Sequence, residues 1–284
     1  MSEITVVTNT IRRPIELVEK SVRAALSQKP EVDVVLVDQN PVPLSFPKDV
    51  SDHPRFHHQH VPVPAVSMAR NRAVLPADCQ WIIFCDDDGY MDLNYLSALK
   101  AQISSTPEIS IFAGVIRRID TGEYYSRRHA LGGNMKWFWN TKLLMGSNFC
   151  VKRAAFERLE KFDEDFGAGA RHGSSEETDF AWNAFFNHES MVFTPELVVY
   201  HVPPFTGEPD GELQKAWRYG VGKGALVRKW LERGHFWPVF ELVEMLLLPL
   251  LQGTLSILRF RIPDARLRFA GLRGRLIGLL GLSS

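Results

Sequence analysis

The stretch WIIFCDDDGYMD, residues 81–92, places Asp86, Asp87 and Asp88 directly behind a run of apolar residues typical of a buried strand. Adjacent carboxylates repel one another, and a buried carboxylate is costly unless something positive meets it. The residues alone leave two interpretations open. The triplet either forms a solvated turn that caps the next helix, or it binds Mg²⁺ or Mn²⁺ together with substrate phosphates.

The composition of the whole chain is typical of a globular protein, and its formal net charge of zero argues against a nucleic-acid partner. Cys79, Cys85 and Cys150 form no CxxC pair, so we expect buried thiols in a reducing compartment. The opening MSEITVVTNT lacks the pattern of a signal peptide, which predicts a cytosolic location.

Strand-like runs alternate with helical patterns over the first 200 residues. Residues 15–26 have apolar residues at helical spacing and lie between strand-like runs at 4–8 and 32–38, which predicts a βαβ unit. Further strands are expected at 81–86 and 110–116, a strand followed by a helix at 148–159, a helix from 175 and a bent strand or strand pair at 191–202. The continuous apolar strands predict an α/β fold with helices on both faces of the sheet.

Other polar residues occur where these elements begin or end. Asp38 ends a strand, Glu176 and Glu177 open a helix, and His201 ends the last strand. Ligands of open α/β sheets bind beyond the carboxyl ends of the strands, where acids can hold a metal. By themselves, however, the two glutamates are ordinary first-turn residues of a helix, and a lone histidine is more often structural.

Several motifs in this order resemble those of the family-2 glycosyltransferases with the GT-A fold. The resemblance extends over roughly residues 3 to 205. The matching segments are TVVTNTIRRP (5–14), VVLVDQN (34–40), SMARNRAV (67–74), FCDDDGYMDLNYL (84–96), GSNFCVKRAAFERLEKFDEDF (146–166), SEETDFAW (175–182) and VVYHVP (198–203). The resemblance implies a Rossmann-like, mostly parallel central sheet that binds a nucleotide sugar.

The resemblance also implies a role for each matching residue. Asp88 would bind Mg²⁺ or Mn²⁺, with His201 as a further contact. The nucleotide sugar would contact Thr10, Asp38, Arg70, Asp86 and Asp87. The family's general base falls on Glu177, in a Glu-Glu pair where the family has Glu-Asp, so Glu176 or Asp179 is an alternative base. A single displacement would invert the anomeric centre.

The turn-rich segment PPFTGEPDGE, residues 203–212, predicts a boundary between a catalytic domain, 1–205, and a helical region, 206–284. An uncharged run, Met245–Leu258, contains Pro249 and has 14 residues, fewer than the roughly 20 that span a bilayer. Arginines follow it. We expect peripheral membrane contact through 236–275, ahead of a core or homodimer helix and of a spanning helix.

The resulting hypothesis is a metal-dependent inverting glycosyltransferase at the cytoplasmic face of the inner membrane. It would move a sugar from a nucleotide-sugar donor to a glycan or polyprenyl-linked acceptor in cell-surface polysaccharide synthesis. A catalytically inactive scaffold relative and a metal-dependent nucleotidyltransferase are the alternatives. The histidines in HPRFHHQH, residues 53–60, favour a surface loop or edge strand, and Trp137 and Trp139 either stack on a ligand or pack in a core.

Overall fold

The computed structural model describes residues 3–203 and 209–282 of a chain that divides into two compact units. The sheet unit comprises Met1–Asp163 and Phe180–Pro203, and the helical unit comprises Glu164–Asp179 and Pro204–Ser284. The expected boundary between residues 205 and 206 lies outside the described residues. Residues 164–179, which the sequence analysis assigned to the first domain, group with the helical unit.

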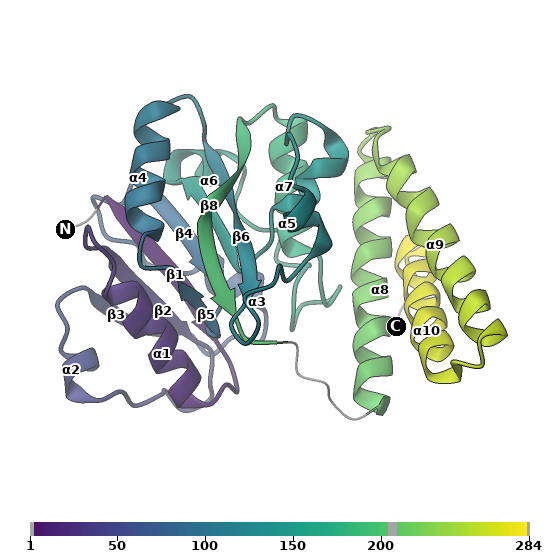
Figure 1. Ribbon diagram of the computed structural model, residues 1–284, viewed down its shortest axis with the longest axis horizontal. Coiled ribbons are helices and arrows are strands. Elements are labelled where there is room, and N and C mark those ends of the chain that lie inside the picture. Colours follow the sequence, from purple (N-terminus) through teal and green to yellow (C-terminus); the bar gives the residue numbers. More distant parts are fainter. Residues whose placement is uncertain (1–2, 204–208, 283–284) are drawn as a thin grey trace. The chain divides into compact units, whose positions relative to one another are not determined.

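Among the described residues, eight strands form one sheet in the order β3-β2-β1-β4-β7-β6-β8-β5 (Figure 1). The strands are β1 (Ile4–Thr10), β2 (Asp33–Asp38), β3 (Phe56–His60), β4 (Trp81–Cys85), β5 (Gly89–Met91), β6 (Ile111–Arg118), β7 (Asn148–Lys152) and β8 (Met191–His201). Strands β1 to β4 pair in parallel, whereas β7 is antiparallel to β4 and β6. Strand β8 is a single strand, parallel to β6 with a register shift, and β5 returns antiparallel to it.

Successive side chains of a strand point to opposite faces of the sheet, and here both sets are buried. Helices therefore cover both faces. The helices of the sheet unit are α1 (Ile15–Leu26), α2 (Lys48–Ser51), α3 (Val66–Asn71), α4 (Tyr95–Ser105), α5 (Arg127–Leu131), the 3₁₀ helix η1 (Phe138–Leu143), α6 (Arg153–Arg158) and the greater part of α7 (Glu176–Phe186). Helices α1 and α4 pack on one face, and α3, α6 and α7 pack on the other. The structure thus confirms the α/β class with a mostly parallel sheet, in which β5 and β7 run antiparallel to their neighbours.

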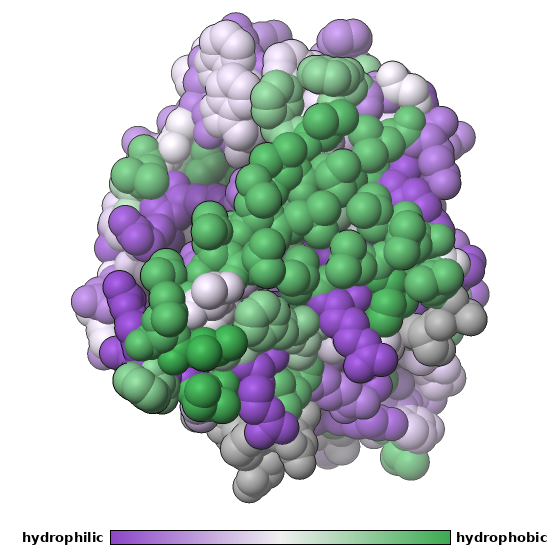
Figure 2. Space-filling model, turned by 90° about the vertical axis from the view of Figure 1, so that its right-hand side faces the viewer, coloured by the Kyte–Doolittle hydropathy of each residue, from purple (hydrophilic) through white to green (hydrophobic). Residues whose placement is uncertain are grey.

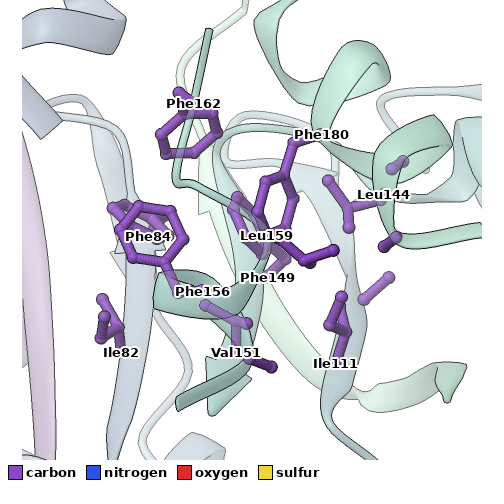
Figure 3. Close-up of a cluster of buried hydrophobic side chains, with 14 of the residues drawn as sticks. Ile82, Phe84, Ile111, Leu144, Phe149, Val151, Phe156, Leu159, Phe162 and Phe180 are labelled. Carbon is purple, nitrogen blue, oxygen red and sulfur yellow. The ribbon is translucent and has the colours of Figure 1, made fainter. Parts of the chain in front are cut away.

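A cluster of phenylalanines fills the second face, between the sheet and helices α6 and α7 (Figure 3). The rings of Phe84 and Phe149 stack with their centroids 5.0 Å apart, and Phe162 meets Phe84 edge-on at 5.2 Å. Phe180 joins them from α7. These contacts fix β4, which carries the aspartate triplet at its end, against the helices behind it.

The described part of the helical unit contains three long helices, α8 (Pro209–Glu232), α9 (Pro238–Leu258) and α10 (Ile262–Leu280). Glycines allow these helices to approach closely: side chains at Gly224 or Gly278 would collide with the facing backbone, of α10 and α8 respectively. One narrow stripe of side chains on α9 is buried against α8 and α10. Glu241 in that stripe forms an ion pair with Lys223 of α8.

Candidate active site

Polar side chains gather where neighbouring strands of the sheet unit end. Thr10 and Asp38 are register partners at the ends of β1 and β2, and the triplet follows β4. Strand β5 begins directly after the triplet at Gly89, whose register partner on β8 is His201. A side chain at Gly89 would press on Cys85 and Val199, so glycine is needed for this tight return. The return brings His201 to the aspartates.

Asp86, Asp88 and His201 form a compact group whose candidate ligand atoms all lie within 4.8 Å of one another. His201 Nε2 lies 2.9 Å from Asp88 Oδ1 and 3.6 Å from Asp86 Oδ2. Burial by itself would lower the pKa of His201, but the two carboxylates outweigh burial and raise the pKa to about 10. Two carboxylates and an imidazole are a donor set that can hold a divalent cation.

Asp87 points away from that group and is buried. It accepts hydrogen bonds from Thr10 Oγ1 at 2.7 Å and from Arg13 Nε at 3.0 Å, and Arg13 also reaches Asp88 Oδ2 at 3.2 Å. Burial raises the pKa of Asp87 to about 6, against the opposing effects of Thr10 and Arg13. The hydrogen bond between Thr10 and Asp87 therefore links the end of β1 to the loop after β4. The expected contact of both residues with a nucleotide stays a prediction.

Arg70 occupies the other side of Asp86 and is almost fully buried. Its Nη2 donates to Asp86 Oδ1 at 2.9 Å and to the carbonyl of Gly146 at 3.1 Å, and its Nε donates to Asn9 Oδ1 at 3.0 Å. Asp86 is the most exposed carboxylate of the triplet, with 36% of its side chain accessible against 5% for Asp88. Asp86 is therefore positioned by Arg70 with one face open to a ligand.

Asp38 is fully buried and its carboxylate already accepts four hydrogen bonds. The donors are Asn40 through its backbone and side chain, the backbone of Leu44, and His58 Nε2 at 3.0 Å. Burial opposes ionisation of Asp38, but the hydrogen bonds from Leu44 and Asn40 outweigh it and lower its pKa. Asp38 shapes the loop after β2, and its contact with a base stays a prediction.

Glu176 and Glu177 lie in the helical unit, in the first turn of α7, so the structure groups them apart from the triplet. Asp179, the third candidate base, is buried and accepts hydrogen bonds from Lys229 Nζ at 2.7 Å and Trp230 Nε1 at 2.8 Å. Its charge is neutralised by this structural ion pair. The two glutamates therefore remain the better candidates for the base.

Two residues near the cluster were not assigned a role from the sequence. Arg13 was noted only as part of a motif, yet it bridges Asp87 and Asp88. The ring of Tyr125 lies 5.2 Å from that of His201, and no local pattern signals this contact. The histidines of residues 56–60 lie on the edge strand β3, as expected. Trp137 and Trp139 stack on each other at 5.3 Å and are about half exposed, so they are not core residues.

A mixed α/β sheet with an acidic cluster beyond its parallel strands is the architecture of the GT-A glycosyltransferases. Residues 5–160 match the family described as Glycosyl transferase family 2, and the chain belongs to this family. No curated protein matches the sequence.

Several solved structures share the fold. The mannosyltransferase PcManGT from Pyrobaculum calidifontis, in complex with GDP-Man and Mn²⁺, is similar at 17% identity and TM-score 0.62, over 99% of this chain and 88% of that chain. TarS from S. aureus, residues 1–349, is similar at 14% identity and TM-score 0.57, over 98% and 91%. GalNAc-T7 with UDP, GalNAc and Mn²⁺ is similar at 15% identity and TM-score 0.54, over 77% of this chain and 47% of the GalNAc-T7 chain.

Proposed function

We propose that this chain is a metal-dependent inverting glycosyltransferase. It transfers a sugar from a nucleotide-sugar donor to a hydroxyl of a glycan or lipid-linked acceptor during synthesis of a cell-surface polysaccharide. The observation that carries the proposal is the cluster of Asp86, Asp88 and His201 in a chain of this family. PcManGT and GalNAc-T7 were both crystallised with Mn²⁺ and a nucleotide or nucleotide sugar, which supports this assignment.

The cluster fits a hard divalent cation. Asp88 Oδ1 is buried and, among the described residues, has no hydrogen-bond partner of suitable geometry, so it retains acceptor capacity. Asp86 and His201 complete the set. A bound Mg²⁺ or Mn²⁺ would neutralise the charge that develops on the departing nucleoside diphosphate. Arg70 and Arg13 hold Asp86 and Asp88 in place, and Glu177, with Glu176 as the alternative, takes the proton of the attacking hydroxyl.

A donor screen by calorimetry and a turnover assay test these roles. UDP-, GDP- and dTDP-sugars are titrated with Mn²⁺ or Mg²⁺ into the wild type and three variants. Asp88→Asn is expected to weaken donor binding by about 100-fold or more, because it removes a metal ligand. Glu177→Gln is expected to keep donor binding and to lose turnover by about 10²–10⁴-fold, with Glu176→Gln as its matched neighbour.

Asp52→Asn, at an exposed turn of the sheet unit, is the control and should behave as the wild type. Donor binding that is equally tight in EDTA would contradict the metal site. Conversion of the nucleotide sugar and added pyrophosphate into a nucleoside triphosphate and a sugar 1-phosphate, rather than release of nucleoside diphosphate, would indicate a nucleotidyltransferase. Binding without turnover of any acceptor, unchanged in Glu177→Gln, would indicate the inactive scaffold relative. The anomer of the product, read by NMR, decides inversion.

Helix α9 supports membrane contact by the helical unit. It is long and apolar enough to cross a bilayer, and it extends beyond the 14-residue run from which the sequence analysis argued against spanning. Only one stripe is buried, however: Pro238, Glu241, Met245, Pro249 and Gly253. The other faces expose large apolar side chains, which form the broad apolar surface in Figure 2. These are Phe240, Val243, Leu247, Leu248, Leu250, Leu251, Leu255, Ile257 and Leu258 of α9, with Phe236 and Trp237 directly before the helix.

We place this surface in the interface of an anionic bilayer at the cytoplasmic face. Exposed arginines follow α9 and continue along α10, and none forms an ion pair with a described residue: Arg259, Arg261, Arg266, Arg268 and Arg273. An apolar face beside unpaired cations matches a surface of anionic lipid headgroups. Because one stripe of α9 is packed on α8 and α10, the helix lies along the membrane rather than through it.

Vesicle sedimentation tests this membrane contact. Leu251→Glu is expected to reduce binding to phosphatidylglycerol vesicles by at least about tenfold, because it places a charge in the apolar face. Leu93→Glu, at a leucine of the sheet unit that is even more exposed, is the matched control. The wild type could instead fail to bind vesicles and sediment as a homodimer that Leu251→Glu dissociates. That result would assign the face to a second copy of this chain.

A further inference from the structure

The helical unit contains a pocket of about 600 Å³ between the loop of residues 167–173 and the first half of α8. This volume lies within the range of small-molecule sites. The aromatic side chains of Trp217 and Tyr219 form part of its wall, and the mechanism described above does not use it.

The charged side chains that line the pocket are all cationic. They are Arg171, Lys215 and Arg218, with His172 beside them. No described carboxylate lines the pocket or forms an ion pair with any of these three cations. Three like charges around one concavity repel one another, and an anion of charge −2 or more relieves that repulsion.

The loop adds backbone donors to these cations. Gly169 and Gly173 have positive φ values, 81° and 65°, which a residue with a side chain rarely adopts. The N–H groups of Ala168, Gly169 and Arg171 donate to no acceptor among the described residues. Free backbone N–H groups next to arginines are the arrangement that binds phosphate oxygens in proteins.

The loop of the pocket leads directly into the helix that carries the proposed general base. The loop continues from Gly173 into α7, so Gly173 and Glu177 lie within about 15 Å of each other. Helix α8 packs so close to this segment that a side chain at Gly222 would collide with His172 and Ser174. An anion in the pocket would therefore lie near the acid that accepts the proton of the attacking hydroxyl.

We infer that this pocket binds the phosphate or diphosphate group of a lipid-linked acceptor. The inference rests on the proposed function and names its acceptor class. The cations and backbone donors hold the phosphate oxygens, and the unit that carries them also carries the apolar face of α9. The acceptor sugar is thereby directed to Glu177 while its lipid remains at the membrane surface.

Calorimetry on the full chain without divalent metal tests this assignment. Inorganic pyrophosphate and farnesyl diphosphate are titrated into the wild type, the double variant Arg171→Gln/Arg218→Gln, and a control. Lys48→Gln/Lys100→Gln, on exposed helices of the sheet unit, removes the same charge elsewhere. Binding of both probes is expected to weaken at least about tenfold in the double variant and to remain unchanged in the control. Mn²⁺-dependent donor binding should be the same in all three proteins.

Equal affinity of the double variant and the wild type for both probes would overturn the inference. Binding of pyrophosphate without binding of farnesyl diphosphate would also overturn it, since the pocket would then bind a free phosphate rather than a lipid-linked one. If the double variant no longer binds phosphatidylglycerol vesicles but still binds farnesyl diphosphate, the cations bind bilayer headgroups and the inference fails. Failure of donor binding in the wild type refutes the glycosyltransferase separately, because the probes are titrated without metal or donor.

Discussion

The two units use their apolar side chains in opposite ways. In the sheet unit, Phe84, Phe149 and Phe162 are buried in one aromatic cluster between the sheet and its helices. In the helical unit, Phe240 and Leu251 are 56% and 59% exposed on α9. Buried apolar area stabilises the fold, whereas a large exposed apolar surface is typical of a binding face. The comparison indicates that the first unit uses these residues for stability and the second for association.

One arginine from each unit illustrates a similar difference. Arg70 of the sheet unit is buried and bonds to Asp86, Asn9 and Gly146. Arg268 of the helical unit is exposed and has no described ion-pair partner. A buried arginine is part of a site that must keep one geometry, while an exposed one is available to anions. Matched substitutions in the two units test whether these residues differ in role as they differ in burial.

The largest effect is expected for Arg70→Met. The change leaves the partly buried Asp86 without its cation and two further acceptors without a donor, which costs about 3–5 kcal/mol in the free energy of unfolding. Arg268→Gln should change that free energy by less than about 0.5 kcal/mol. Urea unfolding of the metal-free protein measures both. Similar losses in the two variants would show that the arginines of α10 are structural too.

Phe162→Ala is expected to lower the free energy of unfolding by about 3–4 kcal/mol, because it leaves a cavity between Phe84, Phe149 and Phe180. Leu251→Ala, on the exposed face of α9, should cost less than about 0.5 kcal/mol. The same urea titrations compare them. A loss for Leu251→Ala as large as that for Phe162→Ala would mean that another protein surface buries the face in solution.

Several strands and the aspartates of the metal cluster could be predicted from local signals in the sequence, whereas the place of His201 followed only from the family resemblance. Apolar runs marked β1, β2 and β4, and the aspartates directly follow β4. The antiparallel position of β7 between β4 and β6 has no local signal, because it depends on pairing between residues far apart in the chain. The antiparallel strand within this mostly parallel sheet therefore could not be located from the sequence.

The orientation of individual acids could not be predicted either. Asp87 lies between two aspartates of the cluster but is turned inward by Thr10 and Arg13. Asp38 is occupied by His58, which lies on a strand 20 residues later. The direction of a side chain depends on such distant partners, so residues that look equivalent in the sequence differ in the structure.

The metal-free sheet unit is expected to lose stability at alkaline pH. The pKa of His201 is about 10 in the folded chain and near its ordinary value of 6.5 when unfolded, so its stabilising charge is complete below pH 6.5 and lost as the pH rises through 10. The free energy of unfolding should fall by about 2–4 kcal/mol more in the wild type than in His201→Asn over this window.

Urea unfolding at several pH values in EDTA measures this difference. The raised pKa of Asp87, about 6, acts in a lower window, as the pH rises from about 4 to 6, and does not interfere. Added Mn²⁺ should reduce the alkaline loss, because the ion takes over the interaction with the two carboxylates when His201 is neutral. Parallel curves for the wild type and His201→Asn would show that His201 is not charged in the folded protein.

The smallest effect separates charge from apolar contact on the helical unit. Arg268→Gln should weaken binding to phosphatidylglycerol vesicles by about fivefold in 0.1 M salt, because one arginine near an anionic surface contributes about 1 kcal/mol. The difference should vanish near 0.5 M salt, where screening shortens the reach of the charge, while the loss in Leu251→Glu should persist. Lys100→Gln of the sheet unit, as the control, should bind as the wild type does. If Arg268→Gln and Lys100→Gln weaken binding equally, net charge rather than the position of the arginines attracts the protein to the bilayer, and the two units would differ only in their apolar surfaces.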